Sequence, residues 1–406
     1  MRIVAPLALL PILYLAACGD AGSSAPTPTP GPGDASSQSD LDTGTPPLVD
    51  GGPQANDAGV FVTGNPDGKC SKPLPASAAR ADVSKPTSVV GDGTAASCTF
   101  AALSAAVSAG GVVVLDCGPA PVTIPITSAL TPPTNKNTVI DGAGKVTLDG
   151  RGATQILNWN SANFRANDMG LTLQGLAFIN GKIAGSKPIP AAPAPCSQGF
   201  NDGEGGAIFM RDGNLTVIDS YFENNVAAPE GPDVGGGAIR MLGSKRGLTI
   251  VRSTFKNNHA SNGGAVGCLF AKLEVYDSLF LGNTATGHDA NNDDATKCSV
   301  INNGQHEIGS GGNGGALYSD GAGLDVLLCG DKVAADAAGT KAFGGGLFFT
   351  SNDFGGTLTI ADTTMTGNTG GYWTSVKEGT QNNAGTAVGT NTKSLTITSS
   401  TLQGLP

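Results

Sequence analysis

Charged and aromatic side chains are scarce in this sequence of 406 residues, at 14% and 5% of the chain. Long helical bundles and coiled coils are rich in Ala, Glu, Lys and Leu, so this composition excludes them. Positive charge is the scarcer sign, because 23 Lys and Arg residues stand against 33 Asp and Glu residues and leave a net charge of −10. No basic block is present to neutralise a phosphate backbone, so we expect no nucleic-acid partner.

The sequence also lacks the short motifs that mark several kinds of catalytic and cofactor site. It has three His residues and no Cys-x-x-Cys pair, which argues against a zinc site. No Gly-x-Ser-x-Gly turn is present, and the Gly-rich stretches lack the Lys-Ser/Thr of a phosphate-binding loop. Glycine itself is abundant, with 61 residues, and apolar residues at 39% are enough for a core.

Residues 1–18 have the pattern of an export signal. Arg2 is followed by an apolar stretch over residues 3–17 that is too short to cross a bilayer as a stable helix. The stretch ends Leu15-Ala16-Ala17-Cys18, which resembles the lipobox of bacterial lipoproteins. That resemblance implies acylation of Cys18 and, because Gly19 rather than Asp follows, an anchor in the outer membrane. The alternative is an ordinary signal peptide with a Cys near its cleavage site.

Three further segments follow the signal. Residues 19–69 are rich in Pro, Ser, Thr and Gly and cannot bury enough apolar surface to offset their ordering entropy, so we expect a disordered tether. Residues 70–125 are expected to form an N-terminal cap, with a helix over 99–109 and a strand over 112–115. Residues 126–406 are expected to form one repetitive domain.

Two motifs alternate through this domain. The first starts with a Leu and has a large apolar residue seven positions later in every copy but one. The starting leucines are Leu171, Leu215, Leu248, Leu273, Leu324, Leu358 and Leu395, and the residues seven positions on are Phe178, Phe222, Phe255, Phe280, Asp331, Met365 and Leu402. The second motif is Gly-Gly-Ala-Ile or similar and starts at Gly205, Gly236, Gly263, Gly314 and Gly345.

Each repeat therefore holds short strands that alternate apolar and polar residues and end at Gly or Asn. Such strands are stable only when stacked on equivalent neighbours, with their inward side chains in one apolar column. The sequence thus predicts an all-β fold, a parallel β-helix solenoid. We take it as right-handed from the general chirality of parallel crossovers.

The alternating Gly-Gly-Ala-Ile and Phe-x-x-Asn motifs resemble the repeats of the polymorphic outer membrane protein family and of related right-handed, pectin-lyase-like β-helix proteins. The resemblance covers roughly residues 171–406. It implies a secreted or surface β-helix, commonly an adhesin or a carbohydrate-facing domain.

Seven cysteines remain after Cys18, an odd number that allows three disulfides and one free thiol in an oxidising compartment. Cys98 and Cys117 bracket the helix of the cap and are predicted to form a disulfide. Cys329 aligns with Ser and Thr residues of other repeats and is interpreted as packed at the edge of the core. The pairing is left open for Cys70, Cys196, Cys268, Cys298 and Cys329.

Extra residues fall between the Asn of one motif and the next Gly-Gly, at 182–204, 226–235, 284–313 and 369–384. These insertions are expected along one edge of the solenoid, which in repeat proteins is often the binding face. The alternative is that loops are merely tolerated there.

Two of the insertions carry candidate binding residues. His288 and Asp289 lie in the 284–313 insertion, where Asp289, Asn291 and Asp293 have the oxygen spacing that begins a calcium loop. The alternative is a solvated acidic loop without Ca²⁺. In the 369–384 insertion, Tyr372 and Trp373 could stack on a sugar ring or cover the C-terminal end of the solenoid.

A third candidate site comes from the position four residues after the repeat Leu. Asp219, Arg252 and Asp277 occupy it on successive coils, with Asp362 further along. An Arg between carboxylates on a β-helix face resembles a pectate-lyase site, in which Ca²⁺ binds an acidic sugar and Arg removes a proton. The alternative is an exposed ladder of ion pairs, worth less than about 1 kcal/mol per pair.

These observations favour a lipid-anchored surface β-helix that binds a polysaccharide or a surface protein without catalysis and needs no cofactor. A polysaccharide lyase or glycoside hydrolase that uses Asp219, Arg252 and Asp277 is the first alternative. A purely structural envelope protein is the second.

Overall fold

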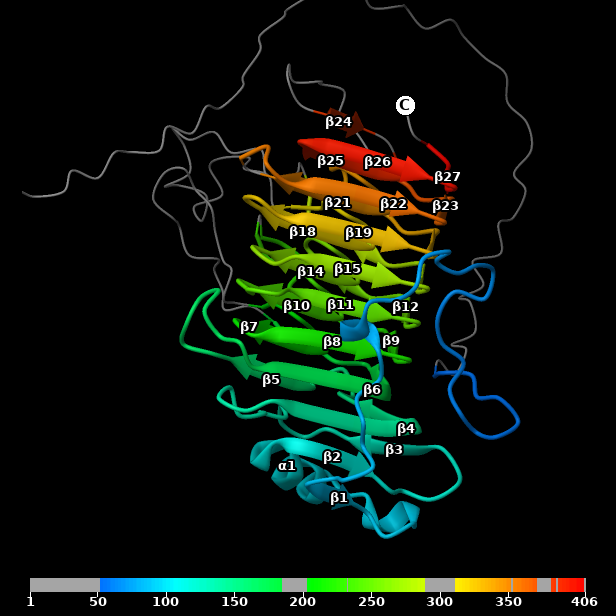
Figure 1. Cartoon of the computed structure of the whole chain (residues 1–406), viewed down its shortest axis with the longest axis vertical. Helices are drawn as coiled ribbons and strands as arrows, with labels where there is room; N and C mark the ends of the chain where they lie inside the picture. Colours follow the sequence, from blue (N-terminus) through cyan, green and yellow to red (C-terminus); the bar gives the residue numbers. More distant parts are fainter. Residues whose placement is uncertain are drawn as a thin grey trace, which may run out of the picture. The chain divides into compact units, whose positions relative to one another are not determined.

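The computed structural model describes residues 52–184, 203–231, 233–288, 311–351, 353–370, 381–384 and 386–404. Successive coils of short parallel strands stack on one another, with a single helix, α1 (Phe100–Ala109), near the first coil (Figure 1). The expected all-β parallel β-helix with a helical cap is confirmed. In the described part of the chain, no helix combines the length and the apolar character needed to span a bilayer.

Each complete coil contributes one strand to each of three parallel ribbons. The first ribbon consists of β1 (Ser88–Val90), β2 (Gly111–Leu115), β4 (Thr138–Asp149), β6 (Gly170–Ile179), β8 (Asn214–Ile218), β11 (Leu248–Val251), β15 (Leu273–Tyr276), β19 (Asp325–Cys329), β22 (Thr357–Ala361) and β26 (Ser394–Thr398). The second consists of β3 (Val122–Pro125), the C-terminal parts of β4 and β6, β9 (Tyr221–Glu223), β12 (Thr254–Lys256), β16 (Leu279–Leu281), β20 (Lys332–Ala334), β23 (Thr364–Thr366) and β27 (Thr401–Leu402).

The third ribbon carries the Gly-Gly-Ala-Ile motif. It consists of β5 (Leu157–Asn160), β7 (Ile208–Arg211), β10 (Ile239–Leu242), β14 (Val266–Leu269), β18 (Leu317–Gly321), β21 (Leu347–Ser351) and β25 (Val388–Thr392), and β24 (Gln381–Ala384) pairs antiparallel with β25. A short pair, β13 (His259–Ala260) and β17 (Thr284–Ala285), follows the second ribbon where the insertions begin. Two 3-10 turns, η1 (Ala76–Ala78) and η2 (Ala95–Ser97), lie in the N-terminal part of the described chain.

The core forms because equivalent residues of successive coils meet in register. The rings of Phe178, Phe222, Phe255 and Phe280 stack nearly parallel, with centroids 4.6–4.9 Å apart, and all four side chains are fully buried. Stacked rings add about 0.5–1.5 kcal/mol per pair beyond their burial. The seven-residue spacing in the sequence thus becomes one apolar row along the column.

For the coil that contains Leu324, the repeat alignment predicted from the sequence is two residues out of register. Val326, not Leu324, pairs with Leu273, and Val333 pairs with Phe280. The apparent break at Asp331 therefore disappears, because the row of large apolar residues continues through Val333.

The same correction applies to Cys329. It pairs with Tyr276 and Ala361, not with the Ser and Thr row. Asp331 occupies that row, where its Oδ1 accepts a hydrogen bond from the backbone N–H of Ser278 at 2.7 Å.

The first Gly of the motif is required by the turn into the third ribbon, and in the coil of β21 this position is Gly344, not Gly345, because Leu347 pairs with Leu317. Gly236 has a φ of +74°, and a Cβ there would lie 2.1 Å from the carbonyl oxygen of Ile239. Any side chain would therefore force the two segments apart.

Asn side chains form a second row, inside the turn that follows the second ribbon. Asn258 Oδ1 accepts from the backbone N–H of Asn225, and Asn283 Oδ1 accepts from the backbone N–H of Asn258, both at 3.0 Å. Asp336 takes the next position, where its Oδ1 accepts from the backbone N–H and Nδ2 of Asn283. The row ends at Asn368 among the described residues.

The cap closes the first coil as the sequence predicts. α1 begins after Thr99, whose side chain accepts from the backbone N–H of Ala102, and it buries Leu103 and Val107. The predicted disulfide between Cys98 and Cys117 is present, with the Cα atoms 5.5 Å apart.

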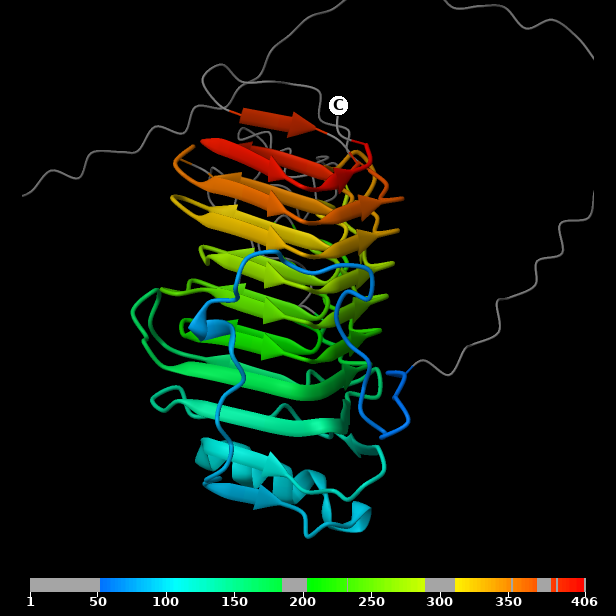
Figure 2. The ribbon, with the colours of Figure 1, turned by 45° about the vertical axis from the view of Figure 1, so that its right-hand side comes forward.

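Residues 52–87, which we call the strap, run along the outside of the column before the chain enters β1 (Figure 2). The strap includes residues 52–69, predicted as part of the tether, and residues 70–87, predicted as part of the cap, so both boundaries are wrong. Phe61 is buried against Ala177, Ile179 and Tyr221. The strap therefore belongs to the folded domain, and the segment expected to be a tether is shorter than residues 19–69.

We predict that Asp336 makes the stability of the domain depend on pH. Its Oδ2 is buried without a hydrogen-bond partner among the described residues, whereas the equivalent Nδ2 of Asn283 donates to the carbonyl of Phe255. Burial raises the pKa of Asp336 to about 8. The protonated form is thus favoured in the folded chain, and stability falls as pH rises from about 4 to about 8, by at most about 1.4 kcal/mol per pH unit.

Asp336→Asn should complete the row of Asn side chains and make the free energy of unfolding depend less on pH. Urea unfolding at pH 5, 7 and 9 measures this dependence. Asp57→Asn, which removes an exposed carboxyl group, is the control for the change in net charge. Parallel pH profiles for the wild type and Asp336→Asn would show that Asp336 is not the responsible group.

Candidate functional site

The structure places the candidate residues Asp219, Arg252 and Asp277 at equivalent corners between the first and second ribbons. Their φ angles are +49°, +43° and +52°, so each has the left-handed backbone that the sharp corner requires. This conformation directs their side chains away from the core, in a row along the column. The row continues at Gly330 and Asp362, which also have positive φ angles.

The first two members of the row form an ion pair. Arg252 donates from Nε to Asp219 Oδ1 at 2.7 Å and from Nη2 to Asp219 Oδ2 at 3.3 Å. Arg80, from the strap, donates to the same carboxylate at 2.7 Å and to Asp141 at 3.1 Å. The two guanidinium groups thus share Asp219, and one of them belongs to a segment 139 residues away in the sequence.

The other acidic corners also bind the strap. Asp277 Oδ1 accepts from the backbone N–H of Cys70, and the carbonyl oxygen of Asp277 accepts from the N–H of Asn65 at 2.8 Å. Asp362 Oδ2 accepts from both the N–H and the hydroxyl of Ser71, which lowers the pKa of its carboxyl group. The corner row is therefore the attachment surface of the strap.

A disulfide between Cys70 and Cys329 fixes the strap covalently to the column, with the Cα atoms 4.9 Å apart. The close approach depends on Gly330, because a Cβ at this corner would lie 2.0 Å from the backbone nitrogen of Cys70. Leu74 and Ala78 then pack against apolar side chains of the first ribbon, among them Ile218 and Val251. Beyond this contact the strap returns along the column toward β1.

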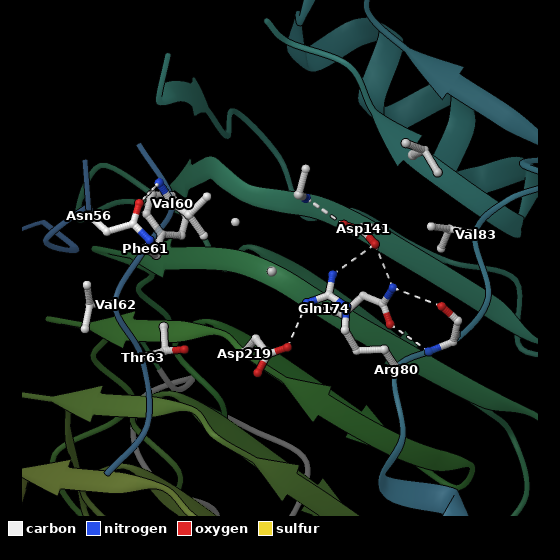
Figure 3. A pocket seen from close by; sticks show the side chains of 15 residues that line it. Asn56, Val60, Phe61, Val62, Thr63, Arg80, Val83, Asp141, Gln174 and Asp219 are labelled. Carbon is white, nitrogen blue, oxygen red and sulfur yellow. Dashed lines mark hydrogen bonds and ion pairs between the residues drawn. The ribbon is translucent and has the colours of Figure 1, made fainter. Parts of the chain in front are cut away.

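The strap runs out along the column before Cys70 and back after it, and these outgoing and returning arms border an open cavity of about 670 Å³ on the corner row (Figure 3). We call it the strap pocket. The outgoing arm forms one wall of the pocket with residues 56 and 60–63, and the returning arm forms the opposite wall with residues 80, 81 and 83. Its floor is Asp141, Ala143, Gly144, Gln174, Gly175 and Asp219, with Val114 at one side.

The polar groups of the strap pocket hold one another in place. Figure 3 shows Arg80 reaching between Asp141 and Asp219, with Gln174 beside it. Gln174 Nε2 donates to Asp141 at 2.6 Å, and Gln174 Oε1 accepts from the N–H of Ala81 at 2.9 Å. Asp141 and Gln174 are buried, whereas the side chains of Asp219 and Arg80 are 26% and 40% exposed. The charged exposed edge of the pocket is therefore the Arg80–Asp219 pair, and Asn56 and Thr63 add polar groups on the outgoing arm.

A second cavity of about 420 Å³ lies beside the first, between residues 63–66, 68 and 69 of the strap and the corners at Arg252 and Asp277. Gly64 packs closely on these corners, because a Cβ there would lie 2.9 Å from the carbonyl oxygen of Asp277 and 3.1 Å from the Cα of Arg252. The strap thus lies over the backbone of Arg252, whose side chain is 39% exposed.

The described residues contain one cluster with metal-binding side chains, Cys70, Cys329 and Asp362. Both sulfur atoms are in the disulfide, so the cluster offers no thiolate. Cys268 is a buried free thiol whose pKa is raised to about 12 by burial, which makes it unreactive.

Of the candidate residues in the insertions, the structure describes His288. It is exposed and forms a parallel bridge with Thr340. The following predicted residues lie outside the described part of the chain: Cys18, Cys196, Asp289, Asn291, Asp293, Cys298, Tyr372 and Trp373. The calcium, aromatic and lipidation predictions remain predictions.

Sequence reasoning identified the corner row but missed its partner. Arg80 has no predicted role because it lies in the segment expected to form the cap, and no charged partner is predicted for Asp141 or Gln174. In the segment expected to be a tether, Phe61 is the available signal, since a large apolar residue is unusual in a disordered segment.

Comparisons with models of known protein families, with curated proteins and with solved structures find no match to this chain. The resemblance to the polymorphic outer membrane protein family therefore stays an expectation from the motifs, and function has to be argued from the site.

We predict that the Cys70–Cys329 disulfide is the main attachment of the strap. Replacing both residues by Ser should lower the free energy of unfolding by about 2–5 kcal/mol, because the bond closes a long loop. It should also speed tryptic cleavage after Lys69, and mass spectrometry of the fragments measures this rate. The double replacement of Cys98 and Cys117 by Ser is the control, which should affect the cap and leave the cleavage rate after Lys69 unchanged. Equal cleavage rates in the wild type and the Cys70 and Cys329 variant would mean that the noncovalent contacts alone hold the strap.

Proposed function

We propose that this protein is an exported, lipid-anchored β-helix that binds an extracellular polysaccharide without catalysis. The observation that carries the proposal is the attachment of the strap to the corner row. Asp219, Arg252 and Asp277 were the candidates for catalysis, and each of them contacts or lies beneath the strap. Their geometry is explained by holding the strap, which favours a binding module over an enzyme.

The lyase alternative needs Arg252 to reach the acidic proton of a sugar. In the folded chain its guanidinium is directed to Asp219, and Gly64 lies above its backbone. The side chain of Arg252 is 39% exposed, but Asp219 holds its guanidinium through two hydrogen bonds, so a substrate would have to compete with this ion pair. A lyase at this face is therefore the less favourable proposal.

Two observations support an exported location. The disulfides Cys70–Cys329 and Cys98–Cys117 are both in positions where they hold the N-terminal part of the domain, and disulfides persist in oxidising compartments. The Leu-Ala-Ala-Cys sequence at residues 15–18 supplies the candidate site for the lipid.

The binding function is tested with the purified chain on immobilised polysaccharides, with and without Ca²⁺, while the absorbance of unsaturated products is followed. We expect retention on at least one polymer and no products. Products that form with the wild type and disappear with Arg252→Ala would establish the lyase. Absence of both retention and products would leave a structural envelope role.

Lipid anchoring is tested separately by Cys18→Ala in a Gram-negative bacterial host. We expect the wild type to fractionate with the outer membrane and the variant to be recovered in the soluble fraction, because the acceptor thiol is lost. Cys268→Ala is the control for loss of a thiol. A Cys18→Ala variant that stays with the membrane would contradict the lipobox assignment.

A further inference from the structure

The strap pocket has the form of a small-ligand site. Its volume of about 670 Å³ lies within the range of about 300–1,000 Å³ that is usual for such sites. Both walls come from one segment, and the turn of that segment is fixed by the disulfide of Cys70. The pocket is therefore largely formed before any ligand arrives, which reduces the entropy cost of binding.

The lining of the pocket combines apolar walls with a polar edge. On the outgoing arm, Val60, Phe61 and Val62 line the pocket, and on the returning arm Val83 lines it. Between the arms, the partly exposed Arg80–Asp219 pair offers guanidinium N–H donors next to carboxylate oxygens. A ligand that fits must present an apolar surface and, at one edge, groups that both donate and accept hydrogen bonds.

The charge of the lining selects against an anion. Among the lining residues, Asp141 and Asp219 are acidic and Arg80 is the one base. Arg80 is already paired with both carboxylates, and the whole chain carries a net charge of −10. Arg252, outside the lining, also pairs with Asp219, so the local charges balance, and a uronate or a phosphate would find no unpaired cation within the described lining.

A neutral sugar meets all of these requirements. The C–H face of a pyranose ring is apolar, and two neighbouring hydroxyl groups can donate to a carboxylate and accept from a guanidinium. Binding would add hydrogen bonds to the Arg80–Asp219 pair without breaking it, so the strap would stay attached.

We propose that the strap pocket binds a neutral sugar unit of an extracellular polysaccharide. This inference rests on the proposed function and assigns to it a site and a ligand class. It places recognition on the corner face of the column, not on the insertions that follow the second ribbon.

The test uses the full chain and two substitutions that fill the pocket from opposite walls, Thr63→Trp and Val83→Trp. Val89→Trp is the matched control, because Val89 is a 54% exposed residue of β1 that does not line the pocket. Thermal unfolding of each variant checks that the fold is retained. Affinity electrophoresis then measures dissociation constants for two neutral polymers, dextran and galactomannan, and for two acidic polymers, polygalacturonate and alginate.

We expect the wild type and Val89→Trp to bind a neutral polymer with equal affinity, and each pocket variant to bind it at least tenfold more weakly. Neutral-polymer binding that neither Thr63→Trp nor Val83→Trp weakens would overturn the pocket assignment and leave the binding function in place. Retention by acidic polymers alone would overturn the ligand class. Absence of binding to any of the four polymers would count against the proposed function itself.

Discussion

In-register stacking of equivalent residues is the constraint on which the rest of this structure depends. Each strand has only three to five residues in most coils, and it is stable because the coils on either side supply its hydrogen bonds and bury its inward side chains. The same stacking generates the Phe and Asn rows inside and the charged corner row outside. An outer row of Asp and Arg at fixed spacing is therefore a product of the fold, and it becomes a surface that another segment can use.

The strap is what distinguishes this molecule from a simple solenoid. Stacked coils contact only their immediate neighbours, so their stabilities add locally. The strap instead joins distant coils: Phe61 packs against Ala177 in the coil of β6, whereas Cys70 bonds to Cys329 and Ser71 binds Asp362 in the coils of β19 and β22. Its docking brings together residues up to 291 positions apart and creates a pocket that the column alone does not have.

The sequence predicted the architecture well, because strand period and motif spacing repeat along the chain. The two-residue alignment error has a physical cause: a slip of two residues keeps the inward and outward faces unchanged, so Leu324 and Val326 are equally acceptable by alternation. Only Asp331, seven positions after Leu324, marked the slip. The ion pair between Asp219 and Arg252 was also predictable from spacing. The strap was not, because its contacts come from scattered single residues such as Phe61, Cys70 and Arg80, which follow no repeat, and from backbone N–H groups that any composition provides.

The disulfide between Cys70 and Cys329 also determines which strand would bear a mechanical force applied to the N-terminus. A pull on the chain before residue 52 would first peel away the noncovalent contacts of the outgoing arm, and it would then reach Cys70. From there the load would pass through a covalent bond into β19, far along the column from the cap. The returning arm, α1 and the first coils would carry no load. The fold would then respond to a pull on its N-terminus as if it were attached by its middle.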